Sequence, residues 1–136
     1  MEHSNDPQNP FLEEMGIKLT KWSEGYVEFE MPIQTWHMNR QGALQGGVVS
    51  TLVDAACGYA GLYEAPGTPA VHGVTITLNV NFLATSRSGV LLAKAKKLGG
   101  GRKIFFSEAQ VYTETGVLIA SGQGSFKYRT AVAETK

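Results

Sequence analysis

The sequence of 136 residues contains a single cysteine, few charged residues and no long apolar run, and each shortage excludes a class of protein. Cys57 cannot form an internal disulfide framework, and its position in an apolar periodic segment predicts a buried thiol rather than a nucleophile. No group of His and Cys residues has the spacing of a metal site, so we expect no bound metal. The length is that of one ordinary domain.

The most apolar stretch, residues 46–63, contains Asp54, Ser50, Thr51 and four glycines, which makes it too polar to span a membrane. Residues 1–10 are polar and contain Asn, Asp and Pro, unlike a signal or transit peptide. We therefore expect a cytoplasmic protein with no membrane partner.

The net charge is zero, because 12 Lys and Arg residues balance 12 Asp and Glu residues. This balance argues against a general nucleic-acid-binding protein. The charges are nevertheless unevenly placed, since residues 65–107 contain no acid. The bases in this segment are Arg87, Lys94, Lys96, Lys97, Arg102 and Lys103. An acid-free basic segment in a neutral chain indicates a local anion site.

Common nucleotide and nucleophile motifs are also missing. Lys103 follows glycines, but no Ser or Thr comes next, so this segment is not a phosphate-binding loop of the Walker type. There is no GxGxxG fingerprint and no GxSxG nucleophile elbow. His37 and His72 lie in predicted loops, where we expect exposed imidazoles rather than catalytic bases.

The hydrophobic pattern predicts strands, one long helix and then more strands. Pro10–Met15 is expected to form a short helix and Tyr26–Pro32 a half-buried strand. Apolar residues recur every three or four positions over residues 46–63, which predicts a long helix. The later strands are expected at residues 74–82, 89–98, 102–113 and 117–128, joined by hairpins. The predicted fold class is α+β, an antiparallel sheet with a single helix covering its apolar face.

No internal repeat or linker interrupts this pattern, so residues 11–128 are predicted to form a single domain. Residues 34–43, before the long helix, are expected to form a loop. Residues 1–10 are expected to be a flexible start, and residues 129–136 a loose polar tail.

Asp54 is the most unusual residue of the predicted helix, because it is the only acid between Glu30 and Glu64. A carboxylate in an apolar helix is exposed, paired with another group, or functional. Gly58 and Gly61 on the same helix indicate the close passage of another backbone or a ligand, unless the helix frays at Gly61. The pattern leaves these alternatives open.

Gln45-Gly46-Gly47 opens the predicted helix and leaves backbone N–H groups uncovered. Such donors suit an oxyanion on a reacting carbonyl, although the two glycines could instead form only a tight entry turn. Gly46 and Asp54 are about 12 Å apart along the helix axis, so one carbonyl cannot touch both. If both act on one substrate, they come from different subunits, with two helices antiparallel across a two-fold axis.

Together these residues resemble a known family. Asn39, Gly42, residues 44–47 (Leu-Gln-Gly-Gly) and Asp54 are similar to the motif of the hotdog-fold acyl-CoA thioesterases of the phenylacetic-acid-degradation (PaaI) type. The later strands and a Gly-Arg-Lys turn also fit, so the resemblance covers residues 11–128. It implies a strongly curved antiparallel sheet wrapped around one long central helix. It also implies a homodimer with two active sites at the subunit interface, often paired into a homotetramer.

The resemblance implies roles for individual residues. Asp54 would be the catalytic carboxylate, and Gly46 would supply the N–H group of the oxyanion hole. Asn39 would position the water or the substrate, and Thr75 falls where some members have a serine that orients the water. Gln45 replaces the histidine that precedes Gly-Gly in the family. An amide can replace a histidine that only orders the loop, but not one that must titrate.

The implied reaction is the hydrolysis of an acyl-CoA thioester to a carboxylic acid and free CoA, with Asp54 either deprotonating water or attacking the carbonyl. No cofactor is expected, since CoA is part of the substrate. Basic residues would meet the CoA phosphates, and the acyl group would lie in an apolar tunnel between subunits. The expected substrate-binding residues are Gly47, Tyr59, Tyr63, Arg87, Arg102 and Lys103. A core role for the tyrosines and a solvated strand face for the bases are the alternatives.

Two other functions use the same fold. A non-catalytic acyl-CoA-binding or sensing module would explain Gln45 in place of the histidine, but the complete set of Asn39, Gly46 and Asp54 argues against it. A hotdog dehydratase or hydratase would need an Asp–His dyad that we do not find. We therefore expect thioester hydrolysis, with acyl-CoA and further copies of this chain as partners and no nucleic acid.

Overall fold

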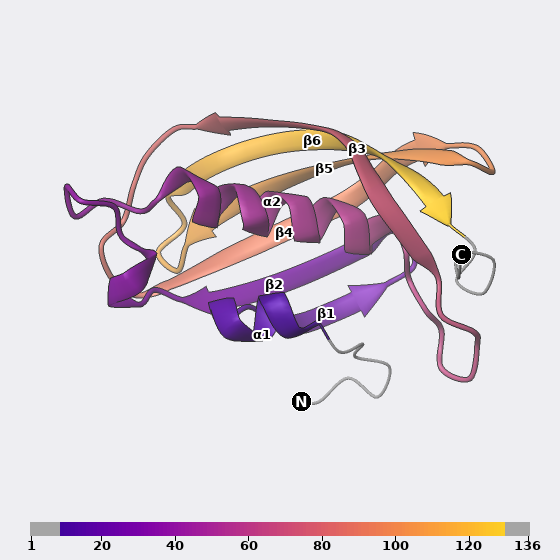
Figure 1. Cartoon of the computed structure of the whole chain (residues 1–136), viewed down its shortest axis with the longest axis horizontal. Helices are drawn as coiled ribbons and strands as arrows, with labels where there is room; N and C mark the ends of the chain where they lie inside the picture. Colours follow the sequence, from indigo (N-terminus) through magenta and orange to yellow (C-terminus); the bar gives the residue numbers. More distant parts are fainter. Residues whose placement is uncertain (1–8, 130–136) are drawn as a thin grey trace.

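The structure is a computed structural model that describes residues 9–129. Residues 1–8 and 130–136, on which the predicted flexible start and loose tail mostly fall, lie outside this range. The described chain forms a curved six-stranded antiparallel sheet around one long helix, α2 (Figure 1). This is the α+β hotdog architecture that the sequence predicts.

The elements follow one another in the predicted order. The helices are α1 (Pro10–Met15), the short 3-10 helix η1 (Thr35–His37) and α2 (Gly46–Gly61). The strands are β1 (Lys18–Ser23), β2 (Tyr26–Pro32), β3 (His72–Phe82), β4 (Val90–Gly100), β5 (Ile104–Thr113) and β6 (Leu118–Arg129). Neighbouring strands are antiparallel, in the order β1-β2-β4-β5-β6-β3.

The short helix α1 begins and ends as its sequence dictates. Pro10 occupies the first turn, where its missing N–H has no partner to lose, and Oδ1 of Asn9 accepts a 3.2 Å hydrogen bond from the backbone N–H of Leu12. Gly16 ends the helix in the left-handed conformation, with φ of 82°. Leu12 and Met15 are buried.

The long helix α2 fills the concave side of the sheet (Figure 1). Of the apolar residues whose spacing predicts this helix, Val48, Leu52 and Ala56 are at most 7 % exposed, as expected, whereas the two tyrosines of the same stripe are only partly buried. Full burial of an aliphatic side chain of this size stabilises the fold by about 1.5–3 kcal/mol. The helix ends at Gly61, two residues before the predicted end, and Leu62 is its C-cap.

Two glycines in β6 allow α2 and β3 to approach this strand closely. A Cβ atom on Gly122 would lie 2.7 Å from Cγ1 of Val53 on α2 and 2.5 Å from the carbonyl oxygen of Asn79 on β3. A Cβ atom on Gly124 would lie 2.7 Å from the carbonyl oxygen of Thr77. Neither position has room for a side chain, so these glycines bring the helix and β3 to the same strand.

The position of β3 differs from the prediction that the later strands form successive hairpins. Within residues 9–129, β3 pairs with β6 alone and lies at the edge of the sheet. Its apolar alternation is typical of a strand with one buried face, yet Val74, Ile76 and Phe82 are 39 %, 51 % and 55 % exposed. A bulge between Thr75 and Thr77 also shifts its register. Local alternation does not specify which strands are neighbours, and an edge strand has one side uncovered.

The two histidines that the sequence assigns to exposed loops have different environments. His72 is exposed, but it is the first residue of β3. His37 ends η1 and is completely buried, so the prediction of an exposed imidazole is wrong there. Its Nδ1 accepts a hydrogen bond from the backbone N–H of Gln34, and its Nε2 donates to the carbonyl oxygen of Met15, both at 2.9 Å. These two partners make burial of the polar ring favourable.

Candidate active site

Asp54 is half-buried on α2 at a point where a hydroxyl group from β3 meets it. The hydroxyl of Thr75 donates a 2.7 Å hydrogen bond to Oδ1 of Asp54, although the two residues are 21 positions apart in the chain. No Lys or Arg side chain within residues 9–129 forms a salt bridge with Asp54. The fold therefore joins two residues that the sequence singles out separately, and it leaves the carboxylate without a cation.

Asp54 and Thr75 line an open cavity of about 270 Å³ between α1, α2 and β3. The cavity also has an apolar wall formed by Phe11, Leu12, Tyr59, Leu62 and Phe126. Ligand sites typically combine such a wall with a few polar groups. The sequence does not reveal the two α1 residues of this wall, because nothing in α1 shows which later helix it meets.

The first turn of α2 presents uncapped backbone N–H groups. Gln45 is the N-cap, but its exposed side chain makes no capping hydrogen bond, and the first turn carries no acid. The N–H groups of Val48 and Val49 donate to the carbonyl oxygen of Gln45, and these are the first hydrogen bonds of the helix. The N–H groups of Gly46 and Gly47 come before them in the chain. A Cβ atom on Gly47 would meet nothing within 4 Å. This end of the helix can therefore bind an anion or an oxyanion.

Asn39 orders the loop that leads into α2. Its Oδ1 accepts hydrogen bonds from the backbone N–H groups of Gln41, at 2.9 Å, and Ala43, at 3.0 Å. Met38 and Leu44 face each other across the base of the loop as an antiparallel bridge. Because Oδ1 is bonded within the loop, the group of Asn39 that can reach a substrate is its side-chain NH2.

The two tyrosines expected in the acyl tunnel belong to an aromatic cluster. The ring centroid of Tyr59 is 5.3 Å from that of Trp22 and 5.0 Å from that of Phe29, and Tyr59 also lines the cavity beside Asp54. Tyr63 packs edge-on against Trp22 at 5.5 Å and is not part of that cavity wall. Tyr59 thus packs in the core and also borders the cavity, whereas Tyr63 packs against the core away from that cavity.

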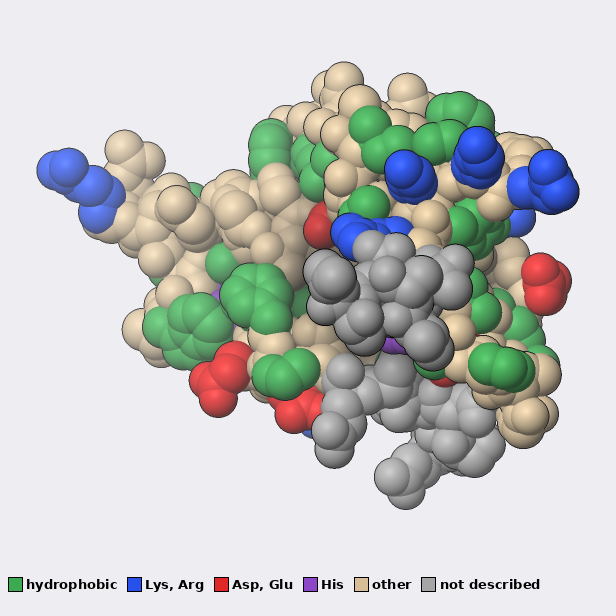
Figure 2. Space-filling view, turned by 45° about the vertical axis from the view of Figure 1, so that its right-hand side comes forward, with side chains coloured by type: hydrophobic (Ala, Val, Ile, Leu, Met, Phe, Trp, Pro, Cys, Tyr) green, Lys and Arg blue, Asp and Glu red, His purple; other side chains and the backbone are tan. Residues whose placement is uncertain are grey.

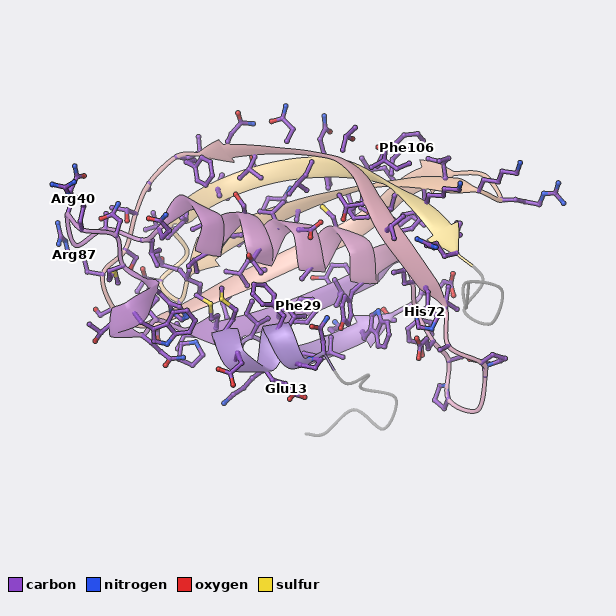
Figure 3. All side chains as sticks on the ribbon, in the orientation of Figure 1. Glu13, Phe29, Arg40, His72, Arg87 and Phe106 are labelled. Atoms are coloured by element: carbon purple, nitrogen blue, oxygen red, sulfur yellow. The ribbon has the colours of Figure 1, made fainter. Side chains whose placement is uncertain are left out.

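The bases expected to meet the CoA phosphates lie in two separate places. Nη1 of Arg87, after β3, donates a 2.9 Å hydrogen bond to the carbonyl oxygen of Gly42, and Arg40 projects from the same end of the molecule (Figure 3). Arg102 and Lys103 are exposed in the β4–β5 turn at the opposite end (Figure 1). In Figure 2 basic side chains lie at the left end of the face and are also spread from its centre to the right end. A single chain does not bring the three predicted residues together.

Gly58 and Gly61 face the sheet of their own chain. A Cβ atom on Gly61 would lie 2.1 Å from Cε2 of Phe105, and one on Gly58 would lie 3.5 Å from Cε2 of Phe126. These two rings stack with their centroids 5.1 Å apart. At Gly61 the close neighbour that the sequence indicates is therefore a phenylalanine ring of the same chain, whereas Gly58 also lines the cavity beside Asp54.

Cys57, one turn after Asp54 on α2, is completely buried, as the sequence predicts. Burial, followed by the nearby negative charges of Asp54 and Glu108, raises the pKa of its thiol to about 12. The thiol therefore keeps its proton at neutral pH. Among residues 9–129, the His, Cys, Asp and Glu side chains form no group of three or more that could hold a metal ion.

The family model of the thioesterase superfamily matches residues 41–120, which is more than half of the chain. The chain belongs to the thioesterase superfamily. The matched segment runs from the loop before α2 to the start of β6, and it contains Gly46, Asp54 and Thr75. The segment that matches the family model is therefore the part of the fold that carries the candidate site.

Named relatives and solved structures agree with this family. Human acyl-coenzyme A thioesterase 13 is 31 % identical over 109 residues, which cover 79 % of this chain and 76 % of the human protein. A thioesterase from Haemophilus influenzae has 25 % identity and a TM-score of 0.81, covering 98 % of this chain and 89 % of that one. A mutant of the phenylacetic acid degradation protein PaaI from Thermus thermophilus shares the fold, with a TM-score of 0.76 at 21 % identity over 88 % of this chain and 98 % of that one.

These relationships make the chain a thioester hydrolase with the hotdog fold. They favour hydrolysis over the non-catalytic sensing module that the sequence left as an alternative. In the described part of this thioesterase, no helix is both long and apolar enough to cross a membrane.

Proposed function

We propose that this thioesterase hydrolyses acyl-CoA thioesters to a carboxylic acid and free CoA, and that each active site combines Asp54 of one subunit with Gly46 of another. The observation that carries the proposal is the spacing of these two groups on one continuous helix, Gly46–Gly61. They are separated by about 12 Å along the helix axis. A reacting carbonyl contacts its catalytic groups at about 3–3.5 Å, so it cannot reach both groups of the same helix.

The exposed edge of β3 supports assembly as a homodimer. Among residues 9–129, this strand of 11 residues has no partner on one side, and its Val74 and Ile76 side chains are exposed. A long apolar edge is a template for pairing with a second chain. Pairing of β3 with its copy across a two-fold axis would place Thr75, and with it Asp54, at the interface. The association of two such dimers into a homotetramer stays a prediction.

The proposed reaction begins with the thioester oxygen at the N–H group of Gly46. Asp54, oriented by Thr75, takes a proton from water, and the water oxygen bonds to the carbonyl carbon. The oxyanion that forms is stabilised by the Gly46 N–H and the start of the helix. When the oxyanion collapses, the C–S bond breaks and the sulfur leaves with the proton as the CoA thiol. In the second route the Asp54 oxygen bonds to the carbonyl carbon, the C–S bond breaks, and CoA leaves as a thiolate that takes a proton from water. Water then hydrolyses the resulting anhydride, which releases the carboxylic acid and restores the Asp54 carboxylate.

An antiparallel dimer would also bring opposite ends of the two subunits together. Arg87 of one subunit would then lie toward Arg102 and Lys103 of the other, and we propose that these bases bind the CoA phosphates. The acyl group would occupy the cavity beside Tyr59, whose wall is mainly apolar.

Mixed dimers test the shared site. Asp54→Asn removes the carboxylate. Gly46→Pro removes the N–H group and still allows the helix to start, because the first position of a helix accommodates proline and Gln45 already has the extended backbone, with φ −66° and ψ 131°, that precedes proline. Each variant alone is expected to lose about 10²–10³-fold or more in kcat. Subunits unfolded together and refolded as a mixture should regain activity, because each mixed dimer contains one intact pair of groups.

Activity in this experiment is the release of free thiol from a panel of acyl-CoA esters. Gly46→Ala is the matched variant, since it keeps the N–H group and its Cβ would lie 3.6 Å from Cζ of Phe82, an ordinary contact. It should lose much less activity than Gly46→Pro. If the mixture stays inactive although mixed dimers form, Asp54 and Gly46 do not share a site between subunits. If wild type releases no thiol from any ester, acyl-CoA hydrolysis is contradicted.

A further inference from the structure

We infer that the buried His37 is a positioning residue for the oxyanion hole, an inference that rests on the proposed role of Gly46. His37 is 0 % exposed, and no step of the proposed reaction uses its ring. A completely buried imidazole is uncommon unless both of its nitrogens have partners, so its contacts indicate what it holds in place.

The ring of His37 is fixed at both nitrogens. The backbone N–H of Gln34 donates to Nδ1, so the proton of the neutral ring is on Nε2, which donates to the carbonyl oxygen of Met15. Gly16 packs directly against Gln34, because a Cβ atom on Gly16 would lie 2.8 Å from Nε2 of Gln34. The imidazole thus connects η1 to the C-terminal end of α1 inside the core.

The backbone of His37 holds the start of α2. Its carbonyl oxygen accepts a 2.9 Å hydrogen bond from the backbone N–H of Gln45. The bridge between Met38 and Leu44 lies next to this bond, so His37 and Gln45 close the base of the loop. Gln45 is the N-cap, and the next N–H group along the chain is that of Gly46. A displacement of His37 is therefore passed to the proposed oxyanion donor through one hydrogen bond and one peptide unit.

The other side of the loop is held by weaker contacts. The backbone N–H of Leu44 donates to the hydroxyl of Thr85 at 3.3 Å, and Arg87 donates to the carbonyl oxygen of Gly42. Both contacts involve exposed side chains, which water can replace as partners. The bond between His37 and Met15 is buried, and in a low-dielectric interior a hydrogen bond fixes geometry more strongly.

The role predicts a specific kinetic effect. An oxyanion donor works within a narrow range of distance, and a misplacement of about 1 Å can reduce the rate about 100-fold. His37→Ala is therefore expected to lower kcat about 100-fold and to change KM less than about threefold, because the groups that bind the substrate stay in place. His37→Asn keeps an acceptor near the position of Nδ1, and His37→Gln keeps a donor near the position of Nε2. Each should lose about tenfold in kcat.

Val27→Ala is the control for a purely structural role. Val27 is a completely buried core residue near the start of β2, whereas His37 lies beyond the end of that strand. Assays are run well below the Tm of every variant. The three variants are compared at a similar loss of Tm. If kcat falls in His37→Asn and His37→Gln but not in Val27→Ala, the positioning role is supported. If kcat is the same in all three variants, the role is overturned. If His37→Ala does not fold, the Asn and Gln variants decide.

Hydrogen exchange distinguishes a failure of this inference from a failure of the proposed function. The amides of residues 45–48 should exchange faster in the His37 variants than in Val27→Ala, whether or not the protein hydrolyses acyl-CoA. If wild type is inactive on every ester, the proposed function fails, and faster exchange still supports the role of His37 in holding the helix start. If the amides of residues 45–48 exchange at the same rate in the His37 variants and in Val27→Ala, the role is overturned. It is also overturned if wild type is active and the His37 variants show faster exchange but an unchanged kcat.

Discussion

Oδ1 of Asp54 accepts a 2.7 Å hydrogen bond from the hydroxyl of Thr75, which belongs to the edge strand β3. This bond fixes the orientation of the carboxylate and leaves Oδ2 for a water molecule or a carbonyl carbon. It also connects the helix that carries Asp54 to the strand through which we propose that two subunits pair. In the proposed dimer, the chemistry and the assembly of this thioesterase would therefore depend on the same few residues.

Thr75→Ala should lower kcat about ten- to hundredfold, because a hydrogen bond to a charged group contributes about 1.5–3 kcal/mol. Thr75→Ser keeps the hydroxyl and should keep most of the activity. Both variants are compared with wild type by thiol release from the acyl-CoA ester that wild type hydrolyses best. Equal kcat values for the Ala and Ser variants would show that the hydroxyl does not orient Asp54 during the reaction.

The sequence is sufficient to predict the elements and the most unusual residues of the site. The spacing of Val48, Leu52 and Ala56 identifies α2, because a helix buries every third or fourth residue. The isolation of Asp54 among apolar residues identifies the carboxylate, because a charge in apolar surroundings is unfavourable unless it is paired or hydrogen-bonded. These signals are local, and they can be read without knowing what the helix contacts.

The features that the sequence does not predict depend on contacts between distant segments. Alternation along β3 indicates a strand but does not place it at the edge beside β6. Gly61 indicates a close neighbour, but its spacing cannot show that this neighbour is Phe105 of the same chain. His37 lies in a segment without periodicity, so its burial follows only from its hydrogen bonds to Gln34 and Met15.

Gly61→Ala should reduce the free energy of unfolding by about 1–3 kcal/mol, because its Cβ would lie 2.1 Å from Cε2 of Phe105 and the packed ring would have to move. Gly47→Ala is the matched substitution in the same helix. Nothing lies within 4 Å of its Cβ, so it should increase stability by up to about 1 kcal/mol. Urea unfolding of both variants measures the difference. A Gly61→Ala protein as stable as wild type would mean that Phe105 reorients at little cost.

Replacement of Arg102 and Lys103 together by alanine should raise KM for acyl-CoA about tenfold or more, because charge-assisted hydrogen bonds to phosphate are lost. The same acyl group on N-acetylcysteamine, a thiol without phosphates, should show no change in KM. Replacement of Lys94 and Lys96 by alanine removes the same charge from the exposed part of β4 and serves as the control. An equal rise in KM for both double variants would indicate a general effect of charge and no specific phosphate site.

Stability should fall as the pH rises above 9.0, the ordinary pKa of a thiol, because burial raises the pKa of Cys57 to about 12 in the folded protein. Below pH 9.0 the folded and unfolded thiols both keep their protons. Between pH 9.0 and about 12 the unfolded thiol ionises first, so unfolding becomes progressively more favourable. Burial, and then a hydrogen bond to Glu28, raises the pKa of Tyr26 from 10.0 to about 12, which acts in the same direction.

The free energy of unfolding in urea at about pH 8 and about pH 11 checks this dependence for wild type, Cys57→Ala and Tyr26→Phe. The decrease between the two pH values should be smaller in Cys57→Ala than in wild type, whatever the variant's stability at the lower pH. It should also be smaller in Tyr26→Phe, and by less, because Tyr26 is only half-buried and water screens its interactions. If all three proteins lose the same free energy, other groups cause the alkaline loss and the thiol ionises equally in both states.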